Sequence, residues 1–260
     1  MEGGSVRTMR SVTAALAGAA VALGLVVAVA APANAAVPDG YYLQPFDPTV
    51  WRVDDGVARA ISPEEWAAAG FPRPAPSPTD YVQYPWSWTI YAVTFWDDAE
   101  ATWDWDRLDA SQWRASGSPV PRPTGWIAGS WLYRFSTAPD ENFVEAPDRS
   151  VHKLTHDEWA ATGFRTPGSR YDEGFLKLSW APNVMWMTGL STGVGRSITY
   201  DDWQRQAFPT PRVVQRVVND RFYKSATSPV IYYQGPAFHR AITAEEWVGA
   251  GRPAPEIRTP

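Results

Sequence analysis

The amino-acid sequence predicts a β-rich α+β repeat protein built from five tandem units of about 45 residues. Three observations lead to this class: a tryptophan-centred pattern recurs five times, helix-capping residues surround each tryptophan, and β-branched and aromatic runs precede each copy. The copies are ISPEEWAAAGFPRP, LDASQWRASGSPVP, LTHDEWAATGFRTP, ITYDDWQRQAFPTP and ITAEEWVGAGRPAP, centred on Trp66, Trp113, Trp159, Trp203 and Trp247. Spacings of 47, 46, 44 and 44 residues leave no room for a separate domain after residue 35.

Each copy predicts a helix of about two turns that begins at a capping box. A Ser, Thr or Asp lies four residues before each tryptophan, and a Glu, Gln or Asp lies directly before it. At this spacing each side chain accepts a hydrogen bond from the other residue's backbone N–H, with the short side chain of Asp202 as the expected exception. An Ile or Leu before the cap is placed to pack against the tryptophan, which is expected in the core. Glycine is expected to end four helices in the left-handed conformation, and Ala207 replaces it in the fourth copy.

Three short antiparallel strands are expected before each helix. The runs TVWRV and VARAI flank Asp54-Asp55-Gly56, which is a typical hairpin turn, and prolines after each helix favour an extended exit. One such unit buries little apolar surface, so the units must stack or close on one another. We expect a five-bladed propeller-like ring, with an open solenoid as the alternative.

Residues 1–35 are predicted to form a secretory signal peptide, with Arg7 and Arg10 before an apolar stretch and an Ala33-Asn34-Ala35 cleavage pattern. A membrane-spanning helix is the alternative for this segment. Residues 36–260 then form a single repeat domain with approximate units 36–78, 79–123, 124–168, 169–211 and 212–260. No second long apolar run follows, so we expect a secreted protein, extracellular or associated with the cell wall, without membrane contact after cleavage.

Composition excludes several classes of protein and site. The chain has no cysteine, which excludes disulfides, thiolate metal sites and a cysteine nucleophile. Its formal net charge of −5 argues against nucleic-acid binding, which depends on Lys and Arg. No metal or other cofactor is expected, and the oligomeric state is left open.

Two groups of residues are candidate ligand contacts. The chain has 15 tryptophans, more than a core of this size needs. The surplus rings are suited either to stack on sugar rings where they remain exposed or, equally, to fill the interfaces between units. The aromatic candidates are Trp51, Trp103, Trp105, Trp186 and Tyr232. The basic candidates are Arg59, His152, Arg196 and Arg240, which all lie seven residues before their tryptophan; alternatively they point to solvent or pair with the capping acid of a neighbouring unit.

Three further patterns could indicate a catalytic or metal site, but each has a more ordinary structural explanation. Asp97, Asp98, Glu100, Asp104 and Asp106 gather in an insertion of the second copy and offer carboxylates for glycoside hydrolysis or for Ca²⁺, although a solvated acidic loop is favoured. The string Gly189-Leu190-Ser191-Thr192-Gly193 matches a nucleophile elbow but falls where a hairpin loop is expected. His152 and His156 are four residues apart, but are expected on a strand and on a helix, respectively.

The sequence therefore predicts a secreted, non-catalytic repeat module that binds an extracellular polymer, a cell-wall or environmental polysaccharide. The alternatives are a glycosidase that uses the acidic insertion and a structural or protein-interaction scaffold. The repeat format resembles tandem aromatic repeats on exported proteins of high-GC Gram-positive bacteria, some of them attached to cell-wall enzymes. This resemblance rests on composition and format, and no functional residue is carried over from it.

Overall fold

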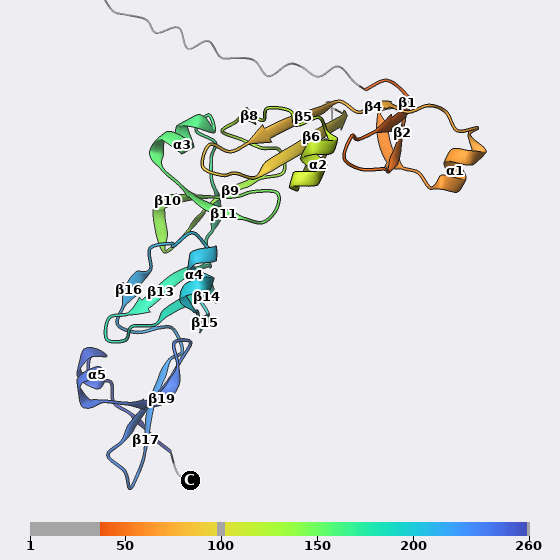
Figure 1. The fold of residues 1–260 in the computed structure, drawn as a ribbon. Helices are drawn as coiled ribbons and strands as arrows, with labels where there is room; N and C mark the ends of the chain where they lie inside the picture. Colours follow the sequence, from red (N-terminus) through yellow and green to blue (C-terminus); the bar gives the residue numbers. More distant parts are fainter. Residues whose placement is uncertain (1–36, 98–101, 259–260) are drawn as a thin grey trace, which may run out of the picture. The chain divides into compact units, whose positions relative to one another are not determined.

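The computed structural model describes residues 37–97 and 102–258, which form five four-stranded sheets, each with one short helix (Figure 1). The predicted class, a β-rich α+β protein of five repeated units, is confirmed, and we number the units 1 to 5 in chain order. The predicted signal peptide and residues 98–101 of the acidic insertion lie outside the described residues. In the part of the chain that is described, no helix combines the length and apolar character needed to cross a membrane.

Unit 1 shows the arrangement that all five units share. Strands β1 (Gly40–Leu43), β2 (Val50–Asp54) and β3 (Val57–Ala60) precede helix α1 (Pro63–Ala68), and β4 (Ala75–Pro76) follows it. The order in the sheet is β3-β2-β1-β4. Strand β4 runs parallel to β1, whereas the other neighbouring strands are antiparallel.

The other four units repeat this order and topology. Their elements are, in unit 2, β5 (Thr79–Gln83), β6 (Ile90–Asp97), β7 (Thr102–Arg107), α2 (Ala110–Ala115) and β8 (Arg122–Pro123); in unit 3, β9 (Trp131–Phe135), β10 (Ala138–Glu145), β11 (Val151–Leu154), α3 (His156–Ala161) and β12 (Gly168–Arg170); in unit 4, β13 (Gly174–Leu178), β14 (Val184–Gly189), β15 (Val194–Ser197), α4 (Tyr200–Arg205) and β16 (Arg212–Val214); and in unit 5, β17 (Arg221–Ser225), β18 (Ile231–Gln234), β19 (His239–Ile242), α5 (Ala244–Gly249) and β20 (Glu256–Arg258).

The fourth strand of each sheet corrects the prediction of three strands per unit. It is formed by the proline-rich segment after the helix, which pairs in parallel with the first strand. Pro76 and Pro123 are tolerated in these strands because they lie at a sheet edge, where a missing N–H need not break the ladder. Strands of two or three residues are too short to show an alternation of apolar and polar residues. The sequence therefore predicts an extended segment after each helix, but not that this segment pairs with the first strand.

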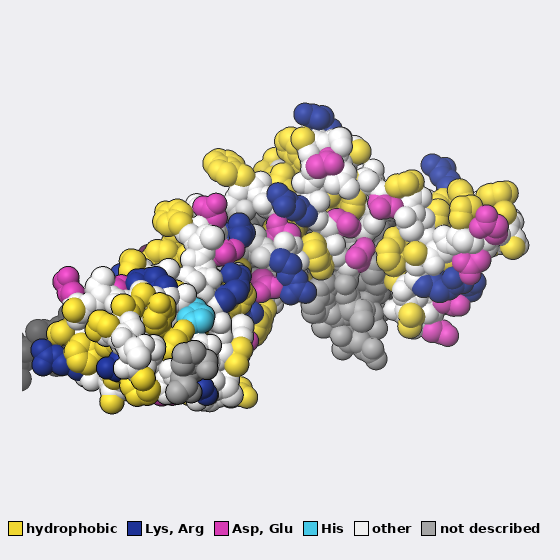
Figure 2. Space-filling model, turned by 90° about the horizontal axis from the view of Figure 1, so that it is seen from below, with side chains coloured by type: hydrophobic (Ala, Val, Ile, Leu, Met, Phe, Trp, Pro, Cys, Tyr) yellow, Lys and Arg dark blue, Asp and Glu magenta, His cyan; other side chains and the backbone are white. Residues whose placement is uncertain are grey.

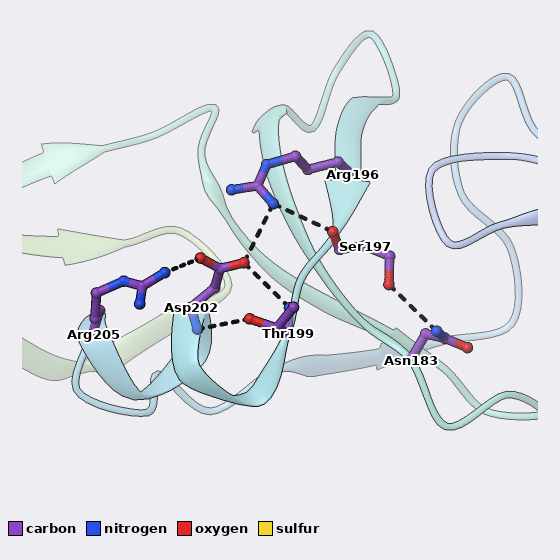
Figure 3. Close-up of polar contacts among 6 residues, drawn as sticks. All are labelled: Asn183, Arg196, Ser197, Thr199, Asp202 and Arg205. Atoms are coloured by element: carbon purple, nitrogen blue, oxygen red, sulfur yellow. Dashed lines mark hydrogen bonds and ion pairs between the residues drawn. The ribbon is translucent and has the colours of Figure 1, made fainter.

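All five helices begin with the predicted capping box. In four units the backbone N–H of the N-cap residue lies 2.7–2.9 Å from the oxygen of the Glu or Gln side chain. In unit 4 the N–H of Thr199 donates to Asp202 over 3.3 Å (Figure 3). The expectation that Asp202 is an exception is therefore wrong, since the shorter side chain makes the same bond at a longer distance.

Each helix ends in two consecutive left-handed residues. The predicted glycines have φ of 78–84°, and Ala207 adopts φ 58° at the same position of unit 4. An L-residue in this region costs about 1–2 kcal/mol, so unit 4 accepts backbone strain that the other units avoid. The next residue is left-handed in every unit, with φ of 53–54°: Phe71, Ser118, Phe164, Phe208 and Arg252.

Replacing Ala207 by glycine is expected to raise the free energy of unfolding by about 1 kcal/mol, because this strain is removed. The reverse change at the equivalent position, Gly163→Ala, is expected to lower it by a similar amount. A Cβ at Gly163 would meet no atom within 4 Å, so that variant reports backbone strain alone. Urea unfolding measures both effects, and equal midpoints for the two variants and the parent would contradict this account.

Each unit shares a hydrophobic core with the next one. The residues that join consecutive units are Phe46 with Ala92 and Leu108, Val82 and Tyr91 with Leu132 and Val144, Phe135 and Phe143 with Phe175, and Met185 and Met187 with Phe222 and Tyr233. Shared cores explain how units that are too small to fold alone are stabilised. Closure of the five units into a propeller-like ring goes beyond these contacts and stays a prediction.

Candidate ligand-binding pockets

The helix tryptophans are half-buried and are not enclosed in the core as predicted. Each indole N–H donates to the backbone carbonyl six residues further on, over 2.9–3.0 Å. This bond fixes the edge of the ring against the chain that leaves the helix. In units 2 to 5 the Ile or Leu before the N-cap belongs to the same hydrophobic cluster as the tryptophan. The tryptophan is thus a rigid aromatic surface that remains partly accessible.

Two units surround this tryptophan with further aromatic rings. In unit 3 the ring of Trp159 lies 5.1 Å from Phe164 and 6.2 Å from His156. In unit 4 the ring of Trp203 lies 5.1 Å from Phe208 and 6.5 Å from Tyr200. We call these two sets, His156–Trp159–Phe164 and Tyr200–Trp203–Phe208, the aromatic triads. Unit 1 has only the Trp66–Phe71 pair, because Pro63 begins its helix.

A pocket lies beside each triad. The unit 3 pocket has a volume of about 230 Å³, and the unit 4 pocket about 290 Å³. Both lie between the start of the helix and the middle hairpin of the sheet. The unit 3 pocket is lined by Arg134, Pro139, Asp140, Asn142, Leu154, Thr155, His156 and Trp159, and the unit 4 pocket by Pro182, Asn183, Val184, Ile198, Thr199, Tyr200 and Trp203.

Side-chain amides are positioned at both pockets by hydrogen bonds. In unit 3, Nε of Arg134 donates to Oδ1 of Asn142 over 2.6 Å, and the guanidinium carbon lies 5.6 Å from the Trp159 ring. In unit 4, Nδ2 of Asn183 donates to Oγ of Ser197 over 3.3 Å (Figure 3). An apolar ring face with a few fixed polar groups is the typical composition of a small-ligand site.

The four basic candidate residues pair with the capping acid of their own unit. The distances are 2.9 Å for Arg59–Glu65, 3.2 Å for His152–Glu158, 3.5 Å for Arg196–Asp202 and 2.6 Å for Arg240–Glu246. The alternative of a pair with a neighbouring unit's acid is therefore wrong. In unit 2, where Asp106 replaces the basic residue, the uncharged Gln112 replaces the acid. Ligand binding by these four residues stays a prediction.

In units 1 and 5 these pairs contribute to a lowered pKa of the capping acid. The Arg240 guanidinium holds the pKa of Glu246 below its ordinary value of 4.5, with the Thr243 N–H as a further cause. The Ser62 N–H and then Arg59 lower the pKa of Glu65 in the same way. A carboxylate whose pKa is lowered by folding stabilises the fold above its unfolded pKa, and this stabilisation is lost as the pH falls through the folded pKa.

We therefore expect the melting temperature to fall as the pH drops below about 4.5, and Glu246→Gln to weaken this dependence. Glutamine keeps the cap, as Gln112 does in unit 2, but it does not titrate. Melting curves of parent and variant between pH 7 and pH 3 test this expectation. Parallel curves over the whole range would show that the pair contributes nothing to acid sensitivity.

The aromatic candidates lie outside the two triad pockets. Trp105 packs against the core shared by units 2 and 3, and Trp51 against the small core of unit 1. Trp186 stacks with Phe175 at 6.2 Å, and its buried N–H has no hydrogen-bond partner among the described residues. Tyr232 is exposed and stacks on Tyr223 at 5.4 Å. Trp103 lies on β7 opposite Phe95. Binding by these rings stays a prediction.

His152 also lines a third pocket, of about 190 Å³, between units 2 and 3. Its ring stacks on Trp86 at 4.7 Å, and Trp86 stacks on Tyr84 at 4.5 Å. Both faces of the Trp86 indole are therefore covered by protein. His152 is the one predicted site residue that lines this pocket, and Ser87 and Ser150 line it as well.

The acidic insertion lengthens a hairpin, and is not simply the loop expected. Asp97 ends β6, and Asp104 and Asp106 lie on β7, whereas Asp98 and Glu100 fall outside the described residues. Asp104 accepts a hydrogen bond from Gln44. Burial, followed by the charges of Asp104 and Asp47, raises the pKa of Asp106.

The two remaining motifs occupy the predicted elements. His152 lies on β11 and His156 begins α3, and within residues 37–97 and 102–258 no group of three or more His, Cys, Asp or Glu is arranged to hold a metal ion. The Gly189–Gly193 string forms the turn between β14 and β15, where Oγ of Ser191 donates to Asp172 over 3.0 Å.

The pocket residues Arg134, Asn142 and Asn183 were not recognisable as site residues from the sequence, because their role depends on contacts between strands and helix. One signal was present. An aromatic residue after the left-handed helix end recurs at Phe71, Phe164 and Phe208, and a ring at a tight turn tends to remain near the surface. Comparison of the chain with protein-family models, curated proteins and solved structures finds no match.

Proposed function

We propose that this protein is a secreted, non-catalytic module that binds an extracellular carbohydrate polymer through pockets repeated on successive units. The supporting observation is that an aromatic triad and a pocket occur together in both unit 3 and unit 4. Aromatic faces pack against the apolar faces of sugar rings, and amide and hydroxyl groups at the rim satisfy sugar hydroxyls.

Repetition supports a polymer as the ligand in preference to a single small molecule. Two weak sites at corresponding positions of successive units can engage successive segments of the same polymer, and the second contact then forms at high effective concentration. On the face drawn in Figure 2, apolar side chains alternate with charges of both signs. Such a mixed surface is suited to several small contacts spread along an extended ligand.

Alanine variants of the exposed triad rings test this function. His156→Ala and Tyr200→Ala each remove an exposed ring that lines its pocket, and neither residue is the N-cap of its helix. Each is expected to weaken retention on immobilised polysaccharide or peptidoglycan by roughly 2- to 10-fold, and the double variant by more. Tyr171→Ala is the matched control, since Tyr171 is 82% exposed and lines neither pocket.

No retention of the parent above a repeat-free control on any of these polymers would overturn the proposal. A fall in polymer length during the incubation would instead favour the glycosidase alternative.

The proposal includes closure of the five units into a propeller-like ring, which would present the pockets at regular angular intervals. Shared cores between consecutive units fit both this ring and an open solenoid. Small-angle X-ray scattering of the protein separates a ring from an open solenoid, because a solenoid gives a larger radius of gyration for the same mass.

A further inference from the structure

We infer that the unit 3 pocket takes a sugar residue that carries a carboxylate, whereas the unit 4 pocket takes an uncharged one. This inference rests on the proposed function and names the ligand class of one of its sites. It depends on Arg134, which lines the unit 3 pocket.

Arg134 is held in place but leaves its charge available. Its Nε is used by Asn142, which is itself buried with 7% of its surface exposed. The two terminal nitrogens have no carboxylate within ion-pair distance among the described residues, whereas Arg59, Arg196 and Arg240 each pair with the capping acid of their own unit. A guanidinium oriented in this way can donate two parallel hydrogen bonds to one carboxylate.

The Trp159 ring beside Arg134 adds a surface for the sugar itself. The guanidinium carbon lies over the indole, 5.6 Å from the ring centroid, so a sugar that contacts the rest of the indole would bring a carboxylate substituent close to the arginine. Asp140 and His156 also line the pocket and are exposed. A carboxylate such as that of Asp140 can accept hydrogen bonds from sugar hydroxyls, and an imidazole such as that of His156 can either donate or accept.

The unit 4 pocket has the same form without a charge. Its lining holds Asn183, Thr199 and Tyr200 as polar residues, and no Lys, Arg, Asp or Glu. The residue of β13 that pairs with Val184 is Lys177, but Lys177 does not line the pocket. The titratable residues in which the unit 3 lining differs are Arg134, Asp140 and His156, and Arg134 is the one with a permanent positive charge that can bind a carboxylate.

The net charge of the protein argues against non-specific electrostatic attraction of an acidic polysaccharide. At a formal net charge of −5 the chain repels a polyanion as a whole, so non-specific attraction cannot account for binding to an acidic polysaccharide.

The test compares soluble polygalacturonate with the same polymer after methyl esterification, using the full chain and isothermal titration calorimetry. The acidic polymer is expected to bind at least about tenfold more tightly, the effect of a charge-assisted hydrogen bond. Arg134→Gln should abolish this preference, and Arg134→Lys should restore only part of it, since lysine keeps the charge but not the planar fork. Lys177→Gln is the matched control and should leave the preference unchanged.

Equal affinity of the parent for the acidic and esterified polymers would overturn the inference and leave the proposed function standing. Binding to neither of these polymers, nor to any other polysaccharide, would overturn both. The parent comparison needs no variant, so it decides the question even if Arg134→Gln unfolds.

Discussion

Replacing Phe175 by alanine is expected to lower the free energy of unfolding by about 3–5 kcal/mol. The ring is fully buried on β13 of unit 4, and it contacts Phe135 of unit 3 edge-on at 5.1 Å. It also stacks with Trp186 at 6.2 Å. The truncation would leave a cavity between the sheets of units 3 and 4. Both sheets would have to move to fill this cavity, so we expect little structural relaxation.

Urea unfolding of the purified variant measures this loss. The exposed aromatic change Tyr171→Ala is the control and is expected to alter stability by no more than about 0.5 kcal/mol. If Phe175→Ala is no more destabilising than this control, the core shared by units 3 and 4 does not contribute to stability.

Gly125→Ala is expected to lower the free energy of unfolding by about 3 kcal/mol, at the upper end of overpacking costs. A Cβ at this position would lie 1.9 Å from the carbonyl oxygen of Ala161 and 2.3 Å from its carbon. These atoms belong to the backbone at the end of α3, so no side-chain rotation can relieve the clash. The segment that enters unit 3 and the helix of that unit must then separate.

Gly40→Ala provides the comparison for this variant. The added Cβ would meet only the Tyr42 side chain, at 3.6 Å or more, which is ordinary contact. Thermal unfolding should show a clear loss for Gly125→Ala and almost none for Gly40→Ala. Similar melting temperatures for both variants would mean that the approach of Gly125 to α3 can be relaxed without cost.

Local features of the fold were predictable because the residues that create them are close in sequence. Capping boxes span four residues, and the left-handed helix ends follow four residues after each tryptophan. The Asp55-Gly56 turn has φ of 50° and 77°, as an Asp-Gly hairpin turn requires. The strand-to-helix ion pairs, six residues apart, were equally local, and the replacement of both partners in unit 2 could have revealed them.

The pockets and the fourth strands were not predictable in the same way. Arg134 and Trp159 are 25 residues apart, and the pairing of β9 with β10 and of β10 with β11 brings the guanidinium toward the helix. The tryptophans were expected in the core because their spacing fits a hydrophobic staple. The indole N–H needs a hydrogen-bond partner, however, and the carbonyl that supplies it lies near the surface.

The hydrogen bond from the helix tryptophan's indole N–H to a backbone carbonyl lies within a single copy in all five units. Donor and acceptor are six residues apart in all five copies, so none of these hydrogen bonds depends on which copy precedes or follows it. Loss or gain of an entire copy would therefore leave these hydrogen bonds intact in the remaining copies. An array assembled in this way can change its number of copies, and under the proposed function its number of binding sites, without a change in the hydrogen bonds inside each remaining copy.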